Sequence, residues 1–113
     1  MNQIPENFVN YKYTPTFEKN SVPKMFLHLQ NTRAGVYGKI CITSGTLKLF
    51  GFFTQRRGDI EQAISIEAGD FFVSPPEYWH KVKFLTEDTT FCVDFYADQN
   101  YEIVKESLSE RNT

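Results

Sequence analysis

Short apolar runs separated by polar turns recur along the chain, which is the pattern of an antiparallel β protein. In residues 60–66 apolar and polar positions alternate strictly, so that Ile60, Ile64 and Ile66 share one face. The same reasoning predicts strands at residues 11–13, 25–30, 36–43, 46–54, 60–66, 71–75, 78–85 and 89–97. Many short strands at nearly regular spacing predict an all-β sandwich or barrel.

The beginning of the chain and one central strand raise the question of what covers the sheets. Three prolines punctuate residues 1–24, and they predict an extended arm that lies over the body. In the strand predicted at 46–54, both leucines and Phe53 point one way, while Phe50 and Phe52 point the other. A strand that is apolar on both faces needs two coverings, which are the arm or a second copy of the chain. We therefore expect a homodimer.

Only the C-terminal end has the period of a helix. Residues 98–109 carry apolar side chains on one stripe that includes Val104 and Leu108. Asp98 or Asn100 can cap the first turn. The sequence therefore predicts a short terminal helix that lies on the sheet.

Composition and charge narrow the class of protein. The 113 residues are enough for a single domain over 1–113, and 16% of them are aromatic, which favours half-buried strands. The net charge is -2 without a basic block, so binding to nucleic acid or to a membrane surface is disfavoured. No apolar run is long enough to span a bilayer and the first residues lack a secretion signal, which predicts a cytoplasmic protein.

His80 is the leading candidate for a functional side chain. In the strand predicted at 78–85, parity places His80 on the inner face, opposite Trp79 and the two lysines. Pro75 and Pro76 precede this strand, and their fixed φ angles create a corner of set geometry. The alternative interpretation is a core histidine that is held by a single hydrogen bond.

His28, the other histidine, lies on a predicted strand with Gln30 on the same face. Two side chains at this spacing can offer two ligands to one metal ion, and zinc is the ion that imidazole most often binds. His28 and His80 alone make a poor metal site, so a third ligand is needed, which Gln30, Glu77 or Asp94 could supply. A structural role for His28 is an equally good interpretation.

Three further residues have weaker signals. Arg33 could bind a carboxylate or an oxyanion through its planar guanidinium, although loop arginines are more often solvated. Cys41 and Cys92 lack the CxxC spacing of a redox motif, and we expect two reduced, buried thiols. Asp94 shares a face with Cys92, and the negative charge of its carboxylate disfavours the thiolate form of Cys92.

The segment GDFFVSPPEYWH resembles the second cupin motif, G-x5-P-x-G-x2-H. Gly69, Pro75 and His80 are in register with it, and Glu77 replaces the inner glycine. The first cupin motif, His-x-His followed by a glutamate, is reduced to His-x-Gln at 28–30 without the glutamate.

Most of the chain resembles the TehB/YeaR-like family of small cupin-like domains, through NTRAGVYGKICITSGTLKLFGF, IEAGDFFVSPPEYWHKV and TEDTTFCVDFY. This resemblance implies a double-stranded β-helix, a jelly-roll barrel with one open mouth. Some members precede a methyltransferase domain in tellurite-resistance proteins. The present chain offers no nucleotide-binding βαβ unit, so neither methyl transfer nor a nucleotide cofactor is expected.

Two classes of function follow. The first is a binding module associated with tellurite resistance, in which His28, Gln30, Arg33 and His80 line the barrel mouth and hold a small molecule, an oxyanion or a divalent metal. The alternative is a small metal-dependent cupin enzyme whose histidine-bound metal activates water or oxygen. A structural dimer without any ligand is the third possibility.

Overall fold

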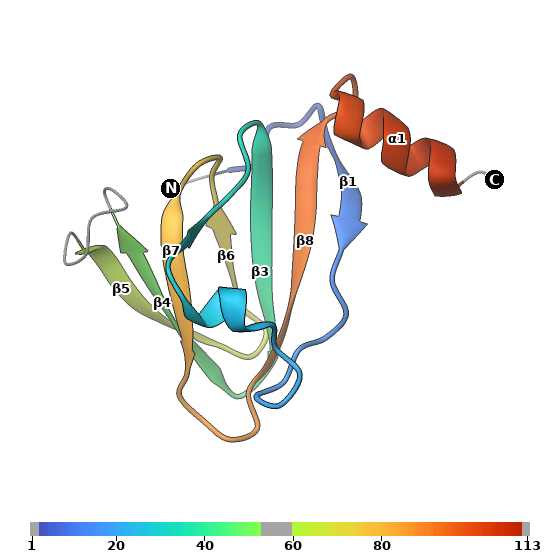
Figure 1. Cartoon of the computed structure of the whole chain (residues 1–113). Coiled ribbons are helices and arrows are strands. Elements are labelled where there is room, and N and C mark those ends of the chain that lie inside the picture. Colours follow the sequence, from blue (N-terminus) through green and yellow to red (C-terminus); the bar gives the residue numbers. More distant parts are fainter. Residues whose placement is uncertain (1–2, 53–59, 112–113) are drawn as a thin grey trace.

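Two four-stranded antiparallel sheets face each other in the computed structural model, which describes residues 3–52 and 60–111 (Figure 1). The elements are β1 (Phe8–Tyr13), η1, a 3-10 helix (Lys24–Leu27), β2 (Gln30–Asn31), β3 (Val36–Ser44), β4 (Thr46–Phe52), β5 (Ile60–Glu67), β6 (Phe71–Ser74), β7 (Trp79–Phe84), β8 (Thr90–Asp98) and α1 (Glu102–Arg111). One sheet has the order β1-β8-β3-β6 and the other β2-β7-β4-β5. The predicted all-β jelly roll with a C-terminal helix is confirmed. Phe53 and the turn predicted at 55–59 lie outside the described residues.

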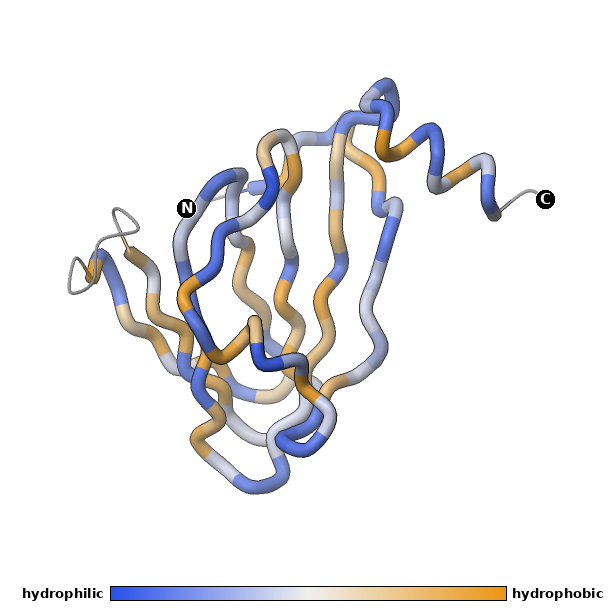
Figure 2. The backbone as a smooth tube through the Cα atoms, viewed as in Figure 1, coloured by the Kyte–Doolittle hydropathy of each residue, from blue (hydrophilic) through white to orange (hydrophobic). Residues whose placement is uncertain are grey.

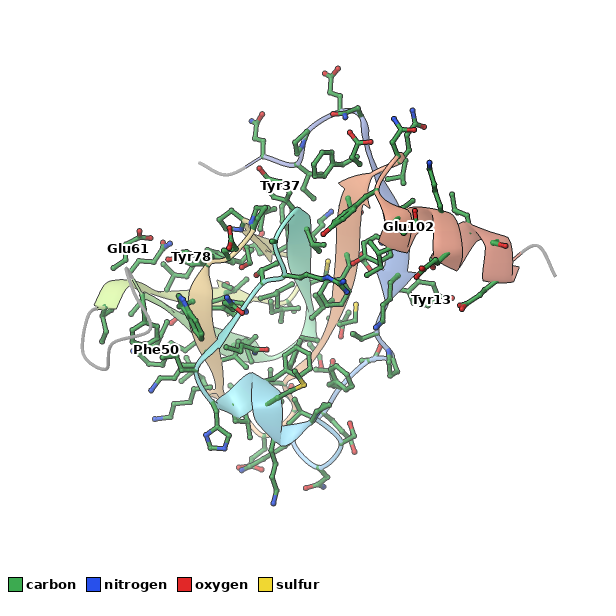
Figure 3. All side chains as sticks on the ribbon, turned by 45° about the horizontal axis from the view of Figure 1, so that its top comes forward. Tyr13, Tyr37, Phe50, Glu61, Tyr78 and Glu102 are labelled. Carbon is green, nitrogen blue, oxygen red and sulfur yellow. The ribbon has the colours of Figure 1, made fainter. Side chains whose placement is uncertain are left out.

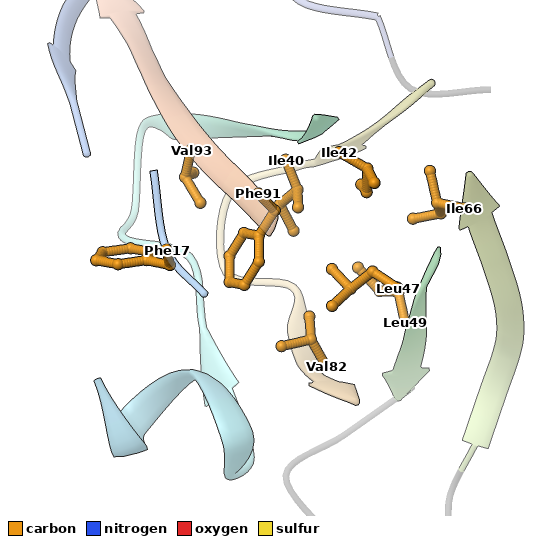
Figure 4. Close-up of a cluster of buried hydrophobic side chains, with 9 residues drawn as sticks. All are labelled: Phe17, Ile40, Ile42, Leu47, Leu49, Ile66, Val82, Phe91 and Val93. Atoms are coloured by element: carbon orange, nitrogen blue, oxygen red, sulfur yellow. The ribbon is translucent and has the colours of Figure 1, made fainter. Parts of the chain in front are cut away.

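The core fills the space between the two sheets (Figure 4). Leu47, Leu49 and Phe91 have no exposed surface, because each occupies an inward position on its strand. Hydrophobic and hydrophilic residues alternate along the strands of the barrel (Figure 2). This alternation gives each sheet one apolar face, and burial of the two apolar faces against each other stabilises the barrel.

The strand predicted at 25–30 is wrong. Residues 25–27 belong to η1, and of the predicted strand only Gln30 belongs to β2. Pro23 precedes η1 with φ -61°, which suits the start of a helical turn. The turn directs Phe26 against the rings of Phe17 and Phe91, at centroid distances of 5.4 and 6.0 Å. Tertiary packing of one aromatic ring therefore overrides the local alternation.

The strict alternation predicted for residues 60–66 fails at its first position. Gly51 pairs with Gln62, whereas Phe52 pairs with Ile60, so Glu61 is an extra residue in β5. A bulge of this kind reverses the facing of the residues beyond it. Ile60 consequently lies on the outer face with half of its surface exposed.

The N-terminal arm adds an edge strand and then crosses to the core. β1 pairs with β8. Further along, Phe17 and Phe91 exchange two backbone hydrogen bonds, with N···O distances of 2.7 and 3.0 Å. The arm thereby covers the aromatic cluster around Phe91.

The outer face of β4 has a different covering. Lys81 Nζ lies 5.4 Å from the ring centroid of Phe50 and 5.8 Å from that of Phe52. Lysine stems cover aromatic surface while the ammonium groups stay in water. Phe52 is buried in this way within one copy of the chain. The homodimer stays a prediction.

Helix α1 begins four residues later than the sequence indicates. Asp98 first forms a turn: its carbonyl accepts a hydrogen bond from the Tyr101 N–H at 2.9 Å. Val104 is then fully buried against the outer edge of the first sheet, while Leu108 is 39% exposed. Among the described residues, no helix is long and apolar enough to cross a bilayer.

Candidate functional site

A cavity of about 210 Å³ opens between the two sheets. Its wall is largely apolar, and its polar side chains are few. They are Gln30, Asn31, Thr32, Arg33, Ser74 and His80. Apolar pockets with a small number of convergent polar groups are the usual form of small-molecule sites.

His80 is held in one orientation within this cavity. Its side chain is 6% exposed, and its Nδ1 atom lies 2.8 Å from the carbonyl oxygen of Tyr78. Since a carbonyl only accepts hydrogen bonds, Nδ1 carries the proton, and Nε2 keeps a lone pair. Burial lowers the pKa of His80, and the Tyr78 carbonyl opposes this shift in part. The imidazole is therefore neutral at pH 7 and offers an acceptor.

Gln30 lies directly opposite His80. The two residues pair across β2 and β7, so their side chains share the inner face. Gln30 Nε2 is buried and has no hydrogen-bond partner among the described residues. Leaving a buried amide donor unpaired costs about 1–3 kcal/mol. The inner face thus carries an unpaired donor on the residue opposite the His80 imidazole.

A hydrogen-bonded loop closes the corner that precedes β7. Thr32 Oγ1 lies 2.7 Å from Ser74 Oγ in the buried interior. The Thr32 carbonyl accepts a hydrogen bond from the Glu77 N–H at 2.7 Å. These contacts tie the residues after β2 to the double-proline corner, so they fix the position of the strand that carries His80.

Glu77 serves this corner through its backbone. Its φ is 60°, in the left-handed region that favours glycine, and it occupies the position at which the second cupin motif has one. The side chain is exposed and does not line the cavity. Glu77 as a ligand-binding residue stays a prediction.

Tyr78 supports His80 from the side. Its ring stacks on the imidazole, with 6.3 Å between centroids and 14° between planes. Its hydroxyl donates to Glu61 Oε1 at 2.6 Å and accepts from Gln62 Nε2 at 2.9 Å (Figure 3). Burial raises the pKa of Tyr78 to about 12; the Gln62 hydrogen bond opposes the shift, and Glu61 adds to it. The phenol is protonated at neutral pH and keeps both hydrogen bonds.

His28 lies apart from this cavity. It follows η1 as an exposed residue and lines a separate hollow with Phe52 and Lys81 on the outer face of the second sheet. The structure does not bring it together with His80. The sequence interpretation depended on a strand at this position, and the 3-10 helix changes which way the residue faces.

Asp94 also points away from the cavity. Its neighbours Val93 and Phe95 line the cavity wall, so the alternation along β8 places Asp94 on the outer face. There its Oδ2 atom lies 4.0 Å from Cys41 Sγ. The prediction of Asp94 as a ligand-binding residue has no support from this position.

Arg33 is the positive group of the cavity. It follows β2, contributes to the cavity lining and is exposed. Among the described residues no carboxylate forms an ion pair with it. Gln30, Arg33 and His80 are therefore the predicted site residues that the structure brings together.

Sequence reasoning missed Thr32, Ser74 and Tyr78. Tyr78 has the same strand parity as His80 and lies within the recognised motif, so that signal was available. The contact between Thr32 and Ser74 depends on the packing of two loops that are distant in sequence, and neither residue type signals it.

Comparison with known proteins assigns the family. The family model of the TehB-like domain matches residues 12–93. The chain belongs to the TehB-like family. The uncharacterized protein YeaR of Escherichia coli (strain K12) is 36% identical over 98% of this chain and 94% of its own length. The probable S-adenosyl-L-methionine-dependent methyltransferase TehB of Haemophilus influenzae is 33% identical over 83% of this chain but only 32% of its own length. This TehB-like chain therefore matches about a third of TehB.

Solved structures agree with the family. A crystal structure of an Escherichia coli (strain K12) protein has a TM-score of 0.80 at 36% identity, covering 86% of this chain and 97% of the other. TehB from Haemophilus influenzae has a TM-score of 0.77 at 25% identity, covering 96% of this chain and 36% of the other. Oxalate decarboxylase from Bacillus subtilis, at 17% identity, has a TM-score of 0.51 over 66% of this chain and 19% of the other, which shows a shared cupin-like fold.

A cupin-like fold raises the question of a metal in the barrel. Zinc takes three or four nitrogen, sulfur or carboxylate donors. Near His80 the cavity offers one imidazole and the Gln30 amide, and Arg33 adds a positive charge. Among the described residues, no three His, Cys, Asp or Glu side chains form a group that could hold a metal ion. The donors of this cavity therefore do not fit a zinc ion.

Proposed function

We propose that this TehB-like domain is a binding module for a small oxyanion or small acid that carries one exchangeable proton. The observation that supports the proposal is the unpaired Gln30 amide beside the neutral His80 imidazole. The imidazole has an acceptor for a ligand O–H and the amide has a donor for a ligand oxygen, so a single ligand with one O–H and one free oxygen satisfies both.

The ligand chemistry follows from the direction of each hydrogen bond. His80 Nδ1 is committed to the Tyr78 carbonyl, so Nε2 accepts a proton from the ligand. Gln30 Nε2 donates to a ligand oxygen. A fully deprotonated anion leaves Nε2 without a donor, and a neutral ketone does the same. A monoprotonated oxyanion fits both groups.

Charge and size restrict the ligand further. Arg33 at the cavity has no ion-pair partner among the described residues and favours a negative charge. A volume of about 210 Å³ is smaller than the roughly 300–1,000 Å³ of typical ligand pockets. We therefore propose that the ligand is a compact inorganic or carboxylic oxyanion. We also propose that the protein acts in the cytoplasm. Tellurite is one candidate, because the family resemblance associates such domains with tellurite resistance.

Calorimetric titration at pH 7 with three anions tests the proposal. Tellurite and phosphate carry a proton at this pH, whereas sulfate carries none. We expect tellurite or phosphate to bind at least about tenfold more tightly than sulfate. Gln30→Ala and His80→Gln should each weaken binding by about 10–100-fold, since each removes a buried hydrogen bond to a charged ligand.

His28→Gln is the matched control, because it changes the other histidine outside the cavity. Its affinity should equal that of the wild type, and circular dichroism should show that all variants are folded. Arg33→Ala should weaken binding and reduce its dependence on salt. Binding that is unchanged in His80→Gln and Gln30→Ala, or the absence of binding by all three anions, would contradict the proposal.

A further inference from the structure

The two cysteines face each other across neighbouring strands. β3 and β8 are antiparallel, and their register pairs Cys41 with Cys92. On β8 the flanking Phe91 and Val93 belong to the core, so Cys92 points to the outer face of the first sheet. Both thiols are free and half-buried, whereas the sequence predicted two reduced, buried thiols. Residues that are 51 positions apart in sequence (92 - 41) thus form a pair that solvent can reach.

The register suits a disulfide. Directly opposite residues in antiparallel strands have Cα atoms about 4.5 or 5.5 Å apart, and disulfides span Cα separations of about 4.4–6.8 Å. The register therefore places the Cα atoms of Cys41 and Cys92 in the range of separations that a disulfide spans.

The surroundings determine how the pair reacts. Burial raises the pKa of the Cys41 thiol, the negative charge of Asp94 raises it further, and Lys39 opposes the shift. Burial and Asp94 also raise the pKa of Cys92. On the neighbouring β6, Phe71 faces Cys41 and carries no charge. The dithiol is thus protonated at neutral pH, and its thiolate fraction rises as the pH increases.

We propose that Cys41 and Cys92 form a reversible redox site that closes to a cross-strand disulfide by exchange with small disulfides of the glutathione class. This inference is independent of the ligand in the cavity. It rests on the register of β3 and β8 and on the exposure of the two thiols.

The exchange occurs in two balanced steps. One cysteine loses its proton to solvent, and its thiolate attacks a sulfur of the small disulfide; this gives a mixed disulfide and releases one small thiol. The second cysteine, also deprotonated, attacks the protein sulfur of the mixed disulfide and releases the second small thiol. The two protein thiols are oxidised, and the small disulfide is reduced to two thiols.

Incubation of the reduced full chain with oxidised glutathione, followed by intact mass measurement, tests the proposal. We expect a product that has lost two hydrogens and carries no glutathione, and that dithiothreitol restores to the starting mass. Its rate of formation should rise up to about tenfold per pH unit between pH 7 and 8, in step with the thiolate fraction. The melting temperature of the oxidised chain should rise by roughly 10 °C, because the bond closes a long loop.

Cys41→Ser and Cys92→Ser are the matched variants. Each should stop at the mixed disulfide with glutathione, since the second attacking thiol is absent. The double variant should melt at the temperature of the reduced wild type. A wild-type product that carries two glutathiones, a dimer linked between chains, or no reaction at pH 9 would overturn the proposal.

Discussion

Gly51 is the position at which the smallest substitution should disturb the site most. It pairs with His80 across β4 and β7, and the Tyr78 ring lies against it. A Cβ atom at this position would overlap the Tyr78 hydroxyl and lie 2.6 Å from Tyr78 Cζ. Gly51→Ala therefore forces the Tyr78 ring away from its hydrogen bonds to Glu61 and Gln62.

The expected loss of stability follows from three contributions. Two partly exposed hydrogen bonds contribute about 0.5–1.5 kcal/mol each, and overpacking costs about 1–3 kcal/mol. Alanine recovers roughly 0.5–1 kcal/mol in a strand because glycine is more flexible in the unfolded chain. Together these contributions predict that the free energy of unfolding falls by about 3 kcal/mol, measured by urea denaturation followed by circular dichroism.

Gly38→Ala is the matched control. Its Cβ would lie 3.8 Å from the side chains of Val93 and Phe95, which is ordinary contact, so the free energy of unfolding should change by less than about 0.5–1 kcal/mol. In a Tyr78→Ala background, Gly51→Ala should cost almost nothing. A cost that is the same with and without the Tyr78 ring would refute the reasoning.

Three other substitutions test separate parts of the structure. Because the pKa of His80 is lowered in the folded chain, the unfolded chain binds more protons, and the free energy of unfolding decreases as the pH is lowered from about 6.5 to the folded pKa. His80→Gln should abolish this contribution in urea denaturation between pH 4 and 7, and His28→Gln should keep it. Glu77→Gly should leave the stability equal or raise it by up to about 1 kcal/mol, because glycine relieves the left-handed φ; a clear loss in urea denaturation would argue against this geometry. Phe91→Ala, at the centre of the aromatic cluster, should cost about 3–5 kcal/mol in the same assay, and a loss below 1 kcal/mol would contradict its central place in the core.

The sequence predicts the barrel well because period-two alternation is a local signal. It fails where a distant contact determines the conformation. Phe26 turns inward to meet Phe17 and Phe91, and this packing produces a helical turn in a segment that alternates like a strand. The bulge that exposes Ile60 depends on the register between two strands, which no single segment contains.

The candidate site shows the same division. Parity within one strand was enough to place His80 inward, and the turn residues around Arg33 were enough to place it in a loop. The sequence placed His28 and Gln30 on one face of a strand and so could not show that only Gln30 lies opposite His80. The helical turn before β2 places His28 on the outer face instead. The facing of Cys41 and Cys92 likewise depends on strand register, which the sequence alone does not reveal.

The state of the His80 ring nitrogens tests the central claim most directly. Long-range proton–nitrogen NMR of the uniformly nitrogen-15-labelled chain at pH 7 resolves the imidazoles of His28 and His80. We predict that His80 is neutral with its proton on Nδ1, and that addition of tellurite or phosphate shifts the Nε2 resonance of His80 while both nitrogens of His28 stay unchanged. A His80 that carries its proton on Nε2, or one whose resonances do not respond to either anion, would contradict the account.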